Sequence, residues 1–396
     1  MNIIIHSDEY YPTCAACTYR MKVFADTFTA NGDNVVVISS SANKESASQQ
    51  VETNERIIYS PTIRMKKKTT VMRLLNNLSF AVTSVFSAMG AGNADVVITT
   101  SPPPLVSISG WLIAKIKHAK LVYDVRDIWP DVALEMKSFD EDSLYCKVFR
   151  WITNFMYHHA DMVTTVSPGK VEKLRKHVGS NANKVRLIAN GFDREVAEGI
   201  LDTELVSRYN LDQDFTCVYI GNIGLAQGID SILKIASETK HRNIQFLLFG
   251  KGAEKEKLES RAKQEHIDNV HFCGVLPHEK VFTLLKYAKM SIIPLKNANM
   301  KDSIPTKVYE ALGLGCPVFL IANGDACDIL TESKLGVSIS PENKDGLTAA
   351  FDCMIDRYEE FASHQTEAEH LMYYKYARQT IAQDLRDQLL DLVGER

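Results

Sequence analysis

The stretch TCVYIGNIGLAQGID, residues 216–230, decides the fold. Thr216 to Ile220 is short, apolar and rich in β-branched residues, which predicts a buried strand. A loop with three glycines follows, and a helical pattern begins near Ile229. A strand, a glycine-rich loop and a helix in this order are typical of a parallel βα unit. Such a loop either turns tightly or brings backbone N–H groups to a phosphate.

The same alternation extends over the chain in two series, which are separated by the linker Asn190-Gly-Phe-Asp193. The predicted strands are residues 2–5, 34–39, 96–99, 121–123, 162–166 and 185–188, and then 216–220, 245–249, 270–272, 290–294, 317–321 and 336–338. Helices are expected between them, for example over residues 18–31 and 144–159. The sequence therefore predicts an α/β protein with two doubly wound domains. Their ligands should bind at the carboxyl ends of the strands, in a cleft where the domains face each other.

The composition excludes several classes of function. The 396 residues carry a net charge of -4, which gives no general reason to expect nucleic-acid binding. A chain that is 24% charged and 45% hydrophobic reads as soluble and globular. His6, Asp8 and Glu9 interrupt the first apolar run, so we recognise no secretory signal and expect a cytoplasmic protein.

Cys14 and Cys17 have the C-x-x-C spacing of redox and zinc sites. The other six cysteines are scattered singly, so a second pair of zinc ligands is missing and a disulfide scaffold is not expected. This loop follows the first predicted strand. We therefore expect its small residues to permit a close approach of the backbone to a ligand.

The segment Lys301 to Val318, KDSIPTKVYEALGLGCPV, follows the strand that ends at Pro294. Pro305 suits the first turn of a helix, on which Lys307 and Glu310 share one face. A cation and a carboxylate placed in this way can divide one ligand between them, with the lysine on a phosphate and the glutamate on sugar hydroxyls. The alternative is a surface ion pair.

Together these motifs resemble the GT-B fold and the retaining glycosyltransferases of family 4. The resemblance rests on the glycine loop 221–228, on Gly250-Lys-Gly252 and on the run from Pro305 to Pro317. Within this family, YDVRDIWPD (123–131) and GNIGLAQG (221–228) resemble the bacterial O-antigen and capsule branch that includes the fucosamine-type transferases.

The resemblance implies that the chain is divided into three parts. Residues 1–192 would form an acceptor-binding domain and residues 193–372 a domain that binds a nucleotide sugar. Residues 373–396 would be a helix that packs back on the first domain, and its apolar stripe reads as core. The implied donor is a UDP-sugar, and the precedent of the family is a retaining transfer that needs no metal or cofactor. The leaving phosphate itself would accept the proton of the incoming hydroxyl, so no protein carboxylate need act as a nucleophile. No Asp-x-Asp follows a predicted strand to hold a divalent cation.

The resemblance also assigns donor-binding residues. Glu310 matches the glutamate that holds the ribose, and Asp302 stands where many members have a glutamate that contacts the transferred sugar. Thr306 and Lys307 would lie near the diphosphate. The remaining donor positions are Ala16 and Cys17 in the first loop, Asn222, Gly224, Gln227 and Gly250 in the glycine loops, and Val275 and Leu276 near the base.

Asn222 and Gln227 are departures from the family pattern, because many members carry an Arg and a Lys at these places. Neutral amides can donate hydrogen bonds but supply no charge to the leaving diphosphate. Lys307, the helix N-terminus near Ile229 and Arg126 are the candidates to compensate, and Lys307, Arg126, Asp127 and Asp302 are the expected catalytic residues.

The expected acceptor-binding residues are Tyr10, Tyr11, Arg126, Asp127 and Trp129. Asp127 would orient the acceptor hydroxyl, or it would cap or brace a loop.

Residues 64–89 give a second indication of what the acceptor is. Arg64 to Lys68 and Arg73 precede the largely apolar stretch Leu74 to Met89, which is too short and polar to span a bilayer. The pattern fits docking on anionic lipid beside a lipid-linked saccharide, or equally a core helix with a solvated basic loop.

The sequence therefore predicts a retaining glycosyltransferase that moves a sugar, an N-acetylated one in our interpretation, from a UDP-sugar to a lipid-linked (polyprenyl-diphosphate) saccharide. The product would belong to bacterial surface polysaccharide, and the enzyme would lie on the inner face of the cytoplasmic membrane. One alternative is a sugar-nucleotide epimerase of GT-B form. Another is an inactive subunit that binds nucleotide sugars.

Overall fold

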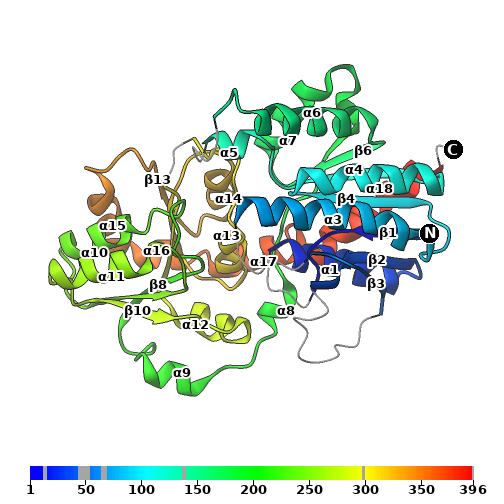
Figure 1. Ribbon diagram of the computed structural model, residues 1–396. Helices are drawn as coiled ribbons and strands as arrows, with labels where there is room; N and C mark the ends of the chain where they lie inside the picture. Colours follow the sequence, from blue (N-terminus) through cyan, green and yellow to red (C-terminus); the bar gives the residue numbers. More distant parts are fainter. Residues whose placement is uncertain (12–15, 43–53, 64–68, 136–139, 297–298, 395–396) are drawn as a thin grey trace. The chain divides into compact units, whose positions relative to one another are not determined.

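The computed structural model describes the chain except for residues 12–15, 43–53, 64–68, 136–139, 297–298 and 395–396. The chain forms two compact units (Figure 1). The first comprises Met1–Asn190 together with Arg378–Arg396, and the second comprises Gly191–Ala377.

The first unit is built on a seven-stranded sheet in the order β3-β2-β1-β4-β5-β6-β7, and its neighbouring strands are parallel. Its strands are β1 Asn2–His6, β2 Asn34–Ser40, β3 Arg56–Ser60, β4 Val96–Ser101, β5 Lys120–Val125, β6 Met162–Thr165 and β7 Val185–Leu187. Six were predicted. The edge strand β3 was missed, because its three apolar residues form only a short run.

Helices cover both faces of this sheet. They are α1 Ala16–Ala30, α3 Thr70–Met89, α4 Pro104–Lys117, α5 Asp131–Glu135, α6 Leu144–His159, α7 Pro168–Val178, the 3₁₀ helix η1 Gly179–Lys184, and α18 Arg378–Gly394. One core joins the sheet to α4, α6 and α7, and the other joins it to α1 and α18. No helix among the described residues is both long and apolar enough to cross a membrane.

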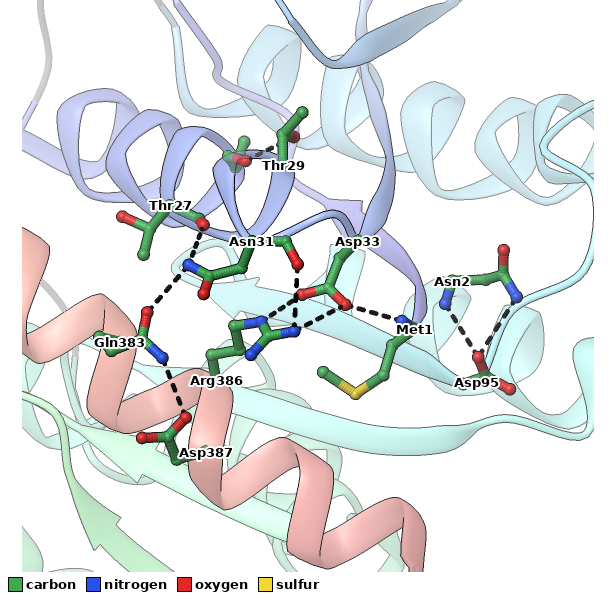
Figure 2. Close-up of polar contacts among 11 residues, drawn as sticks. Met1, Asn2, Thr27, Thr29, Asn31, Asp33, Asp95, Gln383, Arg386 and Asp387 are labelled. Atoms are coloured by element: carbon green, nitrogen blue, oxygen red, sulfur yellow. Dashed lines mark hydrogen bonds and ion pairs between the residues drawn. The ribbon is translucent and has the colours of Figure 1, made fainter.

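Figure 2 shows the polar contacts that hold α18 on the first unit. Asp33 accepts hydrogen bonds from Arg386 Nε at 2.5 Å and from the Met1 amino group at 2.7 Å. Burial raises the pKa of the Asp33 carboxyl, but these two donors hold the pKa below its ordinary value. Beside them, Asn31 donates to Gln383 at 2.9 Å.

The second unit has a six-stranded sheet in the order β10-β9-β8-β11-β12-β13, again with parallel neighbours. Its strands are β8 Phe215–Ile220, β9 Ile244–Phe249, β10 Val270–Gly274, β11 Met290–Pro294, β12 Val318–Ile321 and β13 Gly336–Ile339. All six were predicted. Its helices are α8 Arg194–Ala197, α9 Thr203–Arg208, α10 Asp230–Glu238, α11 Lys255–Gln264, η2 His278–Lys280, α12 Val281–Tyr287, α13 Thr306–Gly313, α14 Asp325–Ser333, α15 Leu347–Asp356, α16 Tyr358–Ala362 and α17 Gln365–Tyr374.

The structure moves both predicted domain boundaries by a few residues, to Asn190 and Ala377. The predicted C-terminal helix from residue 373 is interrupted, because α17 ends at Tyr374 and α18 begins at Arg378. The intervening chain pairs with Phe192, whose N–H donates to the Tyr376 carbonyl at 2.6 Å. Extended pairing here is incompatible with a continuous helix.

Neighbouring leucines on α18 test its packing, because Leu389 is 0% exposed and Leu390 is 42% exposed. We expect Leu389→Ala to lower the free energy of unfolding of the first unit by about 2 to 5 kcal/mol, since it leaves a cavity. Leu390→Ala should change that free energy by less than about 0.5 kcal/mol. Equal effects of the two substitutions in urea unfolding would contradict this packing.

Candidate functional site

The order of the second sheet reverses between β8 and β11, and the loops that follow these two strands meet there. Lys296 donates its backbone N–H to the Ala226 carbonyl at 3.0 Å, which joins the loop after β11 to the glycine loop 221–228. A Cβ on Gly228 would lie 3.0 Å from Lys296 Cα. This reversal is where open parallel sheets bind ligands. The exposed Lys296 was not predicted as a site residue.

Lys307 is held at this edge by Tyr219 from β8. Its Nζ donates to the Tyr219 hydroxyl at 2.8 Å and lies 4.3 Å from the centre of the tyrosine ring. The hydroxyl in turn donates to the Asn222 carbonyl at 2.6 Å. The ammonium group is therefore fixed directly beside the glycine loop.

Gly221 makes room for this lysine. A Cβ at residue 221 would lie 2.6 Å from Lys307 Cε and 2.7 Å from Nζ, closer than real Cβ contacts. The backbone there has φ +144°, which also favours glycine. The first glycine of the loop is therefore explained by a contact within the protein, and that contact positions a cation.

Burial lowers the pKa of Lys307 to about 8, although the nearby Glu310 carboxylate raises it in part. The ammonium form has lost much of its hydration. An anion that binds there would replace some of this hydration and favour the charged form.

Asn222 and Gln227, the predicted departures from the family pattern, face each other across Gly224. Asn222 Nδ2 lies 3.5 Å from Gln227 Oε1, and a Cβ on Gly224 would clash with both amides. The structure thus brings these three predicted residues together. Both side chains are neutral, and Lys307 is a partly buried cation close to the same loop.

Gly250 and Gly252 pack against the same loop. A Cβ on Gly250 would lie 1.8 Å from the Gly221 carbonyl oxygen, and a Cβ on Gly252 would lie 2.2 Å from that of Ile223. The Ile223 N–H also donates to the Lys251 carbonyl at 2.9 Å. The second glycine loop thus supports the first, which is a reason for its glycines that the sequence alone did not reveal.

The remaining donor candidates lie at the same carboxyl edge of the second sheet. Asp302 is in the turn that leads to α13, Thr306 is the first residue of that helix, and Glu310 is one turn further on, partly exposed. After β10, Val275 is 64% exposed while Leu276 packs into the core. Val275 therefore offers more of its side chain to solvent than the partly buried Leu276 does.

In the first unit, the buried Asp124 organises the carboxyl edge of the sheet. It accepts hydrogen bonds from Arg20 Nη2 at 2.9 Å, from Thr164 at 2.7 Å and from Thr100 at 3.2 Å. Burial raises the pKa of its carboxyl, but the charge and hydrogen bonds of Arg20 hold it below the ordinary value. Arg126 donates to the same Thr100 at 3.1 Å, so the arginine is braced by this network.

Asp127 faces Lys170 from α7, whose Nζ lies 3.7 Å from Asp127 Oδ1. Lys170 is almost fully buried and was not predicted, because 43 residues separate the two (170 minus 127). Asp127 is 45% exposed, so this lysine orients a carboxylate that still reaches solvent. Trp129 packs with Tyr145 and Phe149 on α6 and is partly buried.

Tyr10 was expected to contact an acceptor, but its side chain is buried and cannot do so. Tyr10 is 0% exposed, and its hydroxyl donates to Glu55 at 2.6 Å in the interior. Tyr11 is partly exposed at the edge of the core.

Ala16 and Cys17 begin α1, whereas Cys14 lies outside the described residues. Within the described part of the chain, no three His, Cys, Asp or Glu side chains gather as metal ligands would.

Comparison with known proteins agrees with this architecture. Residues 19–196 match the model "Glycosyltransferase Family 4", and residues 203–371 match "Glycosyl transferases group 1". The putative colanic acid biosynthesis glycosyl transferase WcaI of Escherichia coli K12 is 25% identical over 72% of each chain.

Two solved structures share the fold at 16% identity. The sucrose-phosphate synthase of Thermosynechococcus elongatus has a TM-score of 0.81 over 100% of both chains. HepE of Anabaena, in complex with UDP and glucose, has a TM-score of 0.75 and covers 99% of this chain and 100% of its own. The chain thus carries the two domains of a GT-B glycosyltransferase and has a homologue in bacterial polysaccharide biosynthesis.

The packing of the two glycine loops can be tested with a matched pair, Gly250 and Gly274. Both have positive φ, but a Cβ on Gly274 would meet nothing within 4 Å. We expect Gly274→Ala to cost about 1 kcal/mol of stability, from backbone strain alone. Gly250→Ala should cost at least about 2 kcal/mol more, because the loop 221–223 must move. Equal costs in urea unfolding of the second unit would refute the proposed loop packing.

Proposed function

We propose that this protein is a retaining glycosyltransferase that moves a sugar from a UDP-sugar to a lipid-linked saccharide. The observation that carries this proposal is the Lys307 ammonium group, fixed by Tyr219 beside the glycine loop at the reversal of the second sheet. A cation there is suited to the diphosphate of a nucleotide sugar. The bound UDP in HepE, a protein of the same fold, supports the choice of nucleotide.

In this proposal Lys307 neutralises the leaving diphosphate, a charge that Asn222 and Gln227 cannot supply. Glu310 accepts hydrogen bonds from the ribose, Asp302 contacts the transferred sugar, and no metal ion takes part. The leaving phosphate accepts the proton of the incoming hydroxyl on the same face of the sugar, so the configuration is retained.

The first unit would bind the acceptor through Asp127, oriented by Lys170, and through Arg126. The same fold occurs in a sucrose-phosphate synthase, so the fold does not select a lipid-linked acceptor. That choice rests on the relative named for colanic acid biosynthesis and on the exposed apolar helix α3. If the acceptor is lipid-linked, the protein would lie on the cytoplasmic face of the membrane. Membership of the fucosamine-type branch stays a prediction.

The test is release of UDP by the purified full chain, with EDTA present. UDP-, GDP- and ADP-sugars are compared with and without a polyprenyl-diphosphate saccharide. We expect release from a UDP-sugar that depends on the acceptor, and a glycosylated lipid product that retains the donor's anomeric configuration. A changed sugar without free UDP would indicate an epimerase instead. UDP binding with no turnover on any acceptor would indicate a binding subunit.

A further inference from the structure

Helix α3 of the first unit turns its apolar side to solvent. The exposed side chains recur at helical spacing along 20 residues. They are Val71 (66%), Leu74 (43%), Leu75 (40%), Leu78 (48%), Val82 (53%), Phe86 (68%) and Met89 (71%). A usual surface helix turns its apolar stripe to the core. Helix α3 buries Phe80, Ser84 and Ala88 but exposes a longer apolar stripe to solvent.

Asn76, Thr83 and Ser84 of α3 point to the protein, on the same side as the buried Phe80 and Ala88. Asn76 donates to the Ile63 carbonyl at 2.7 Å, and Thr83 donates to the Pro61 carbonyl at 2.8 Å. Ser84 lies 3.0 Å from Nε2 of the buried His6, whose ring stacks on Phe80. These contacts fix the orientation of the helix. The core-helix alternative from the sequence accounts for only one side of α3.

Two further helices continue this surface, because α4 packs against both α3 and α6 (Figure 1). On α4, Leu112 is 39% and Ile116 50% exposed. On α6, Leu144, Val148 and Trp151 form a stripe of spacing four and three, and they are 77%, 44% and 64% exposed. We call the twelve exposed apolar residues of α3, α4 and α6 the apolar face.

Aromatic rings lie at the α4–α6 side of the apolar face. Trp151 stacks on Phe155 at 5.7 Å between ring centres, and Phe155 meets Trp111 edge-on at 5.0 Å. Tryptophan is enriched where proteins enter the boundary between lipid headgroups and acyl chains, because its ring is both apolar and able to donate a hydrogen bond.

The charges of the three helices have one sign. Their sequences contain no Asp or Glu, and their basic residues are Arg73, Lys115, Lys117, Lys147 and Arg150. Asp142 and Glu141, in the turn before α6, pair with Lys147 and Arg150 at 3.4 and 3.3 Å. These exposed pairs add little stability, but their carboxylates offset the charge of Lys147 and Arg150. The remaining positive charge beside the apolar face comes from Arg73 on α3 and from Lys115 and Lys117 on α4.

We propose that the apolar face docks on an anionic lipid bilayer, which would place the first unit against the membrane that carries its acceptor. The proposal rests on the proposed function for the nature of that acceptor. The apolar side chains would enter the boundary of the acyl chains, while the lysines and arginines meet anionic headgroups. A second copy is a poorer occupant, because a two-fold interface would bring the same cations against themselves.

The experiment measures co-sedimentation of the full chain with vesicles of phosphatidylcholine and phosphatidylglycerol. Val82→Ser/Phe86→Ser and Val148→Ser/Trp151→Ser remove apolar area from α3 and α6. Ile200→Ser/Leu201→Ser, at two exposed residues of the second unit, is the matched control. We expect at least a tenfold loss of binding for each of the first two variants, none for the control, and weaker binding of wild type to pure phosphatidylcholine or in high salt.

Unchanged binding of both α3 and α6 variants, or no binding of wild type, would overturn the proposal. A wild-type dimer that both variants convert to monomer, without vesicle binding, would assign the apolar face to a second copy and also overturn it. Far-UV circular dichroism and the urea midpoint check that each variant folds. UDP release with a detergent-dispersed acceptor is measured separately, so that loss of docking is distinguished from failure of the proposed glycosyl transfer.

Discussion

A partly buried ammonium group beside a backbone loop is the constraint on which the candidate site depends. Lys307 donates to the Tyr219 hydroxyl in space that a Cβ at residue 221 would occupy, and the same hydroxyl donates to the Asn222 carbonyl. The backbone of this loop can pack directly against residue 250, because Gly250 has no Cβ to collide with the Gly221 carbonyl oxygen. Two separate loops of the second unit therefore pack together beside a single cation.

In the proposed function, this arrangement would let Lys307 supply the positive charge that the neutral Asn222 and Gln227 do not carry. The amides of Asn222 and Gln227 face each other and can orient a ligand, while the charge comes from α13. Burial lowers the pKa of Lys307 to about 8, which indicates that its ammonium group has lost part of its hydration before any ligand binds. If a diphosphate binds there as proposed, less water would have to be displaced, which is the advantage of a preorganised electrostatic site.

The sequence predicted what depends on local pattern. Two doubly wound sheets, all six strands of the second unit and the glycine loop followed from alternation and turn residues. It missed the pairing of Lys170 with Asp127 and the burial of Tyr10 against Glu55, because these contacts join distant segments whose side-chain directions depend on helix packing. It read residues 74–89 as an amphipathic helix, but only the structure shows that a long apolar stripe faces solvent while Asn76 and Thr83 contact the protein.

The most direct measurement is kcat of acceptor-dependent UDP release for Lys307→Met, alone and combined with Gln227→Lys. The account predicts roughly a 100-fold loss for Lys307→Met, since one charge at the leaving group is removed. It also predicts at least a tenfold recovery in the double variant, because a lysine at 227 returns charge to the same loop. Wild-type kcat for Lys307→Met would contradict the account, and so would a double variant no faster than Lys307→Met when Gln227→Lys alone remains active.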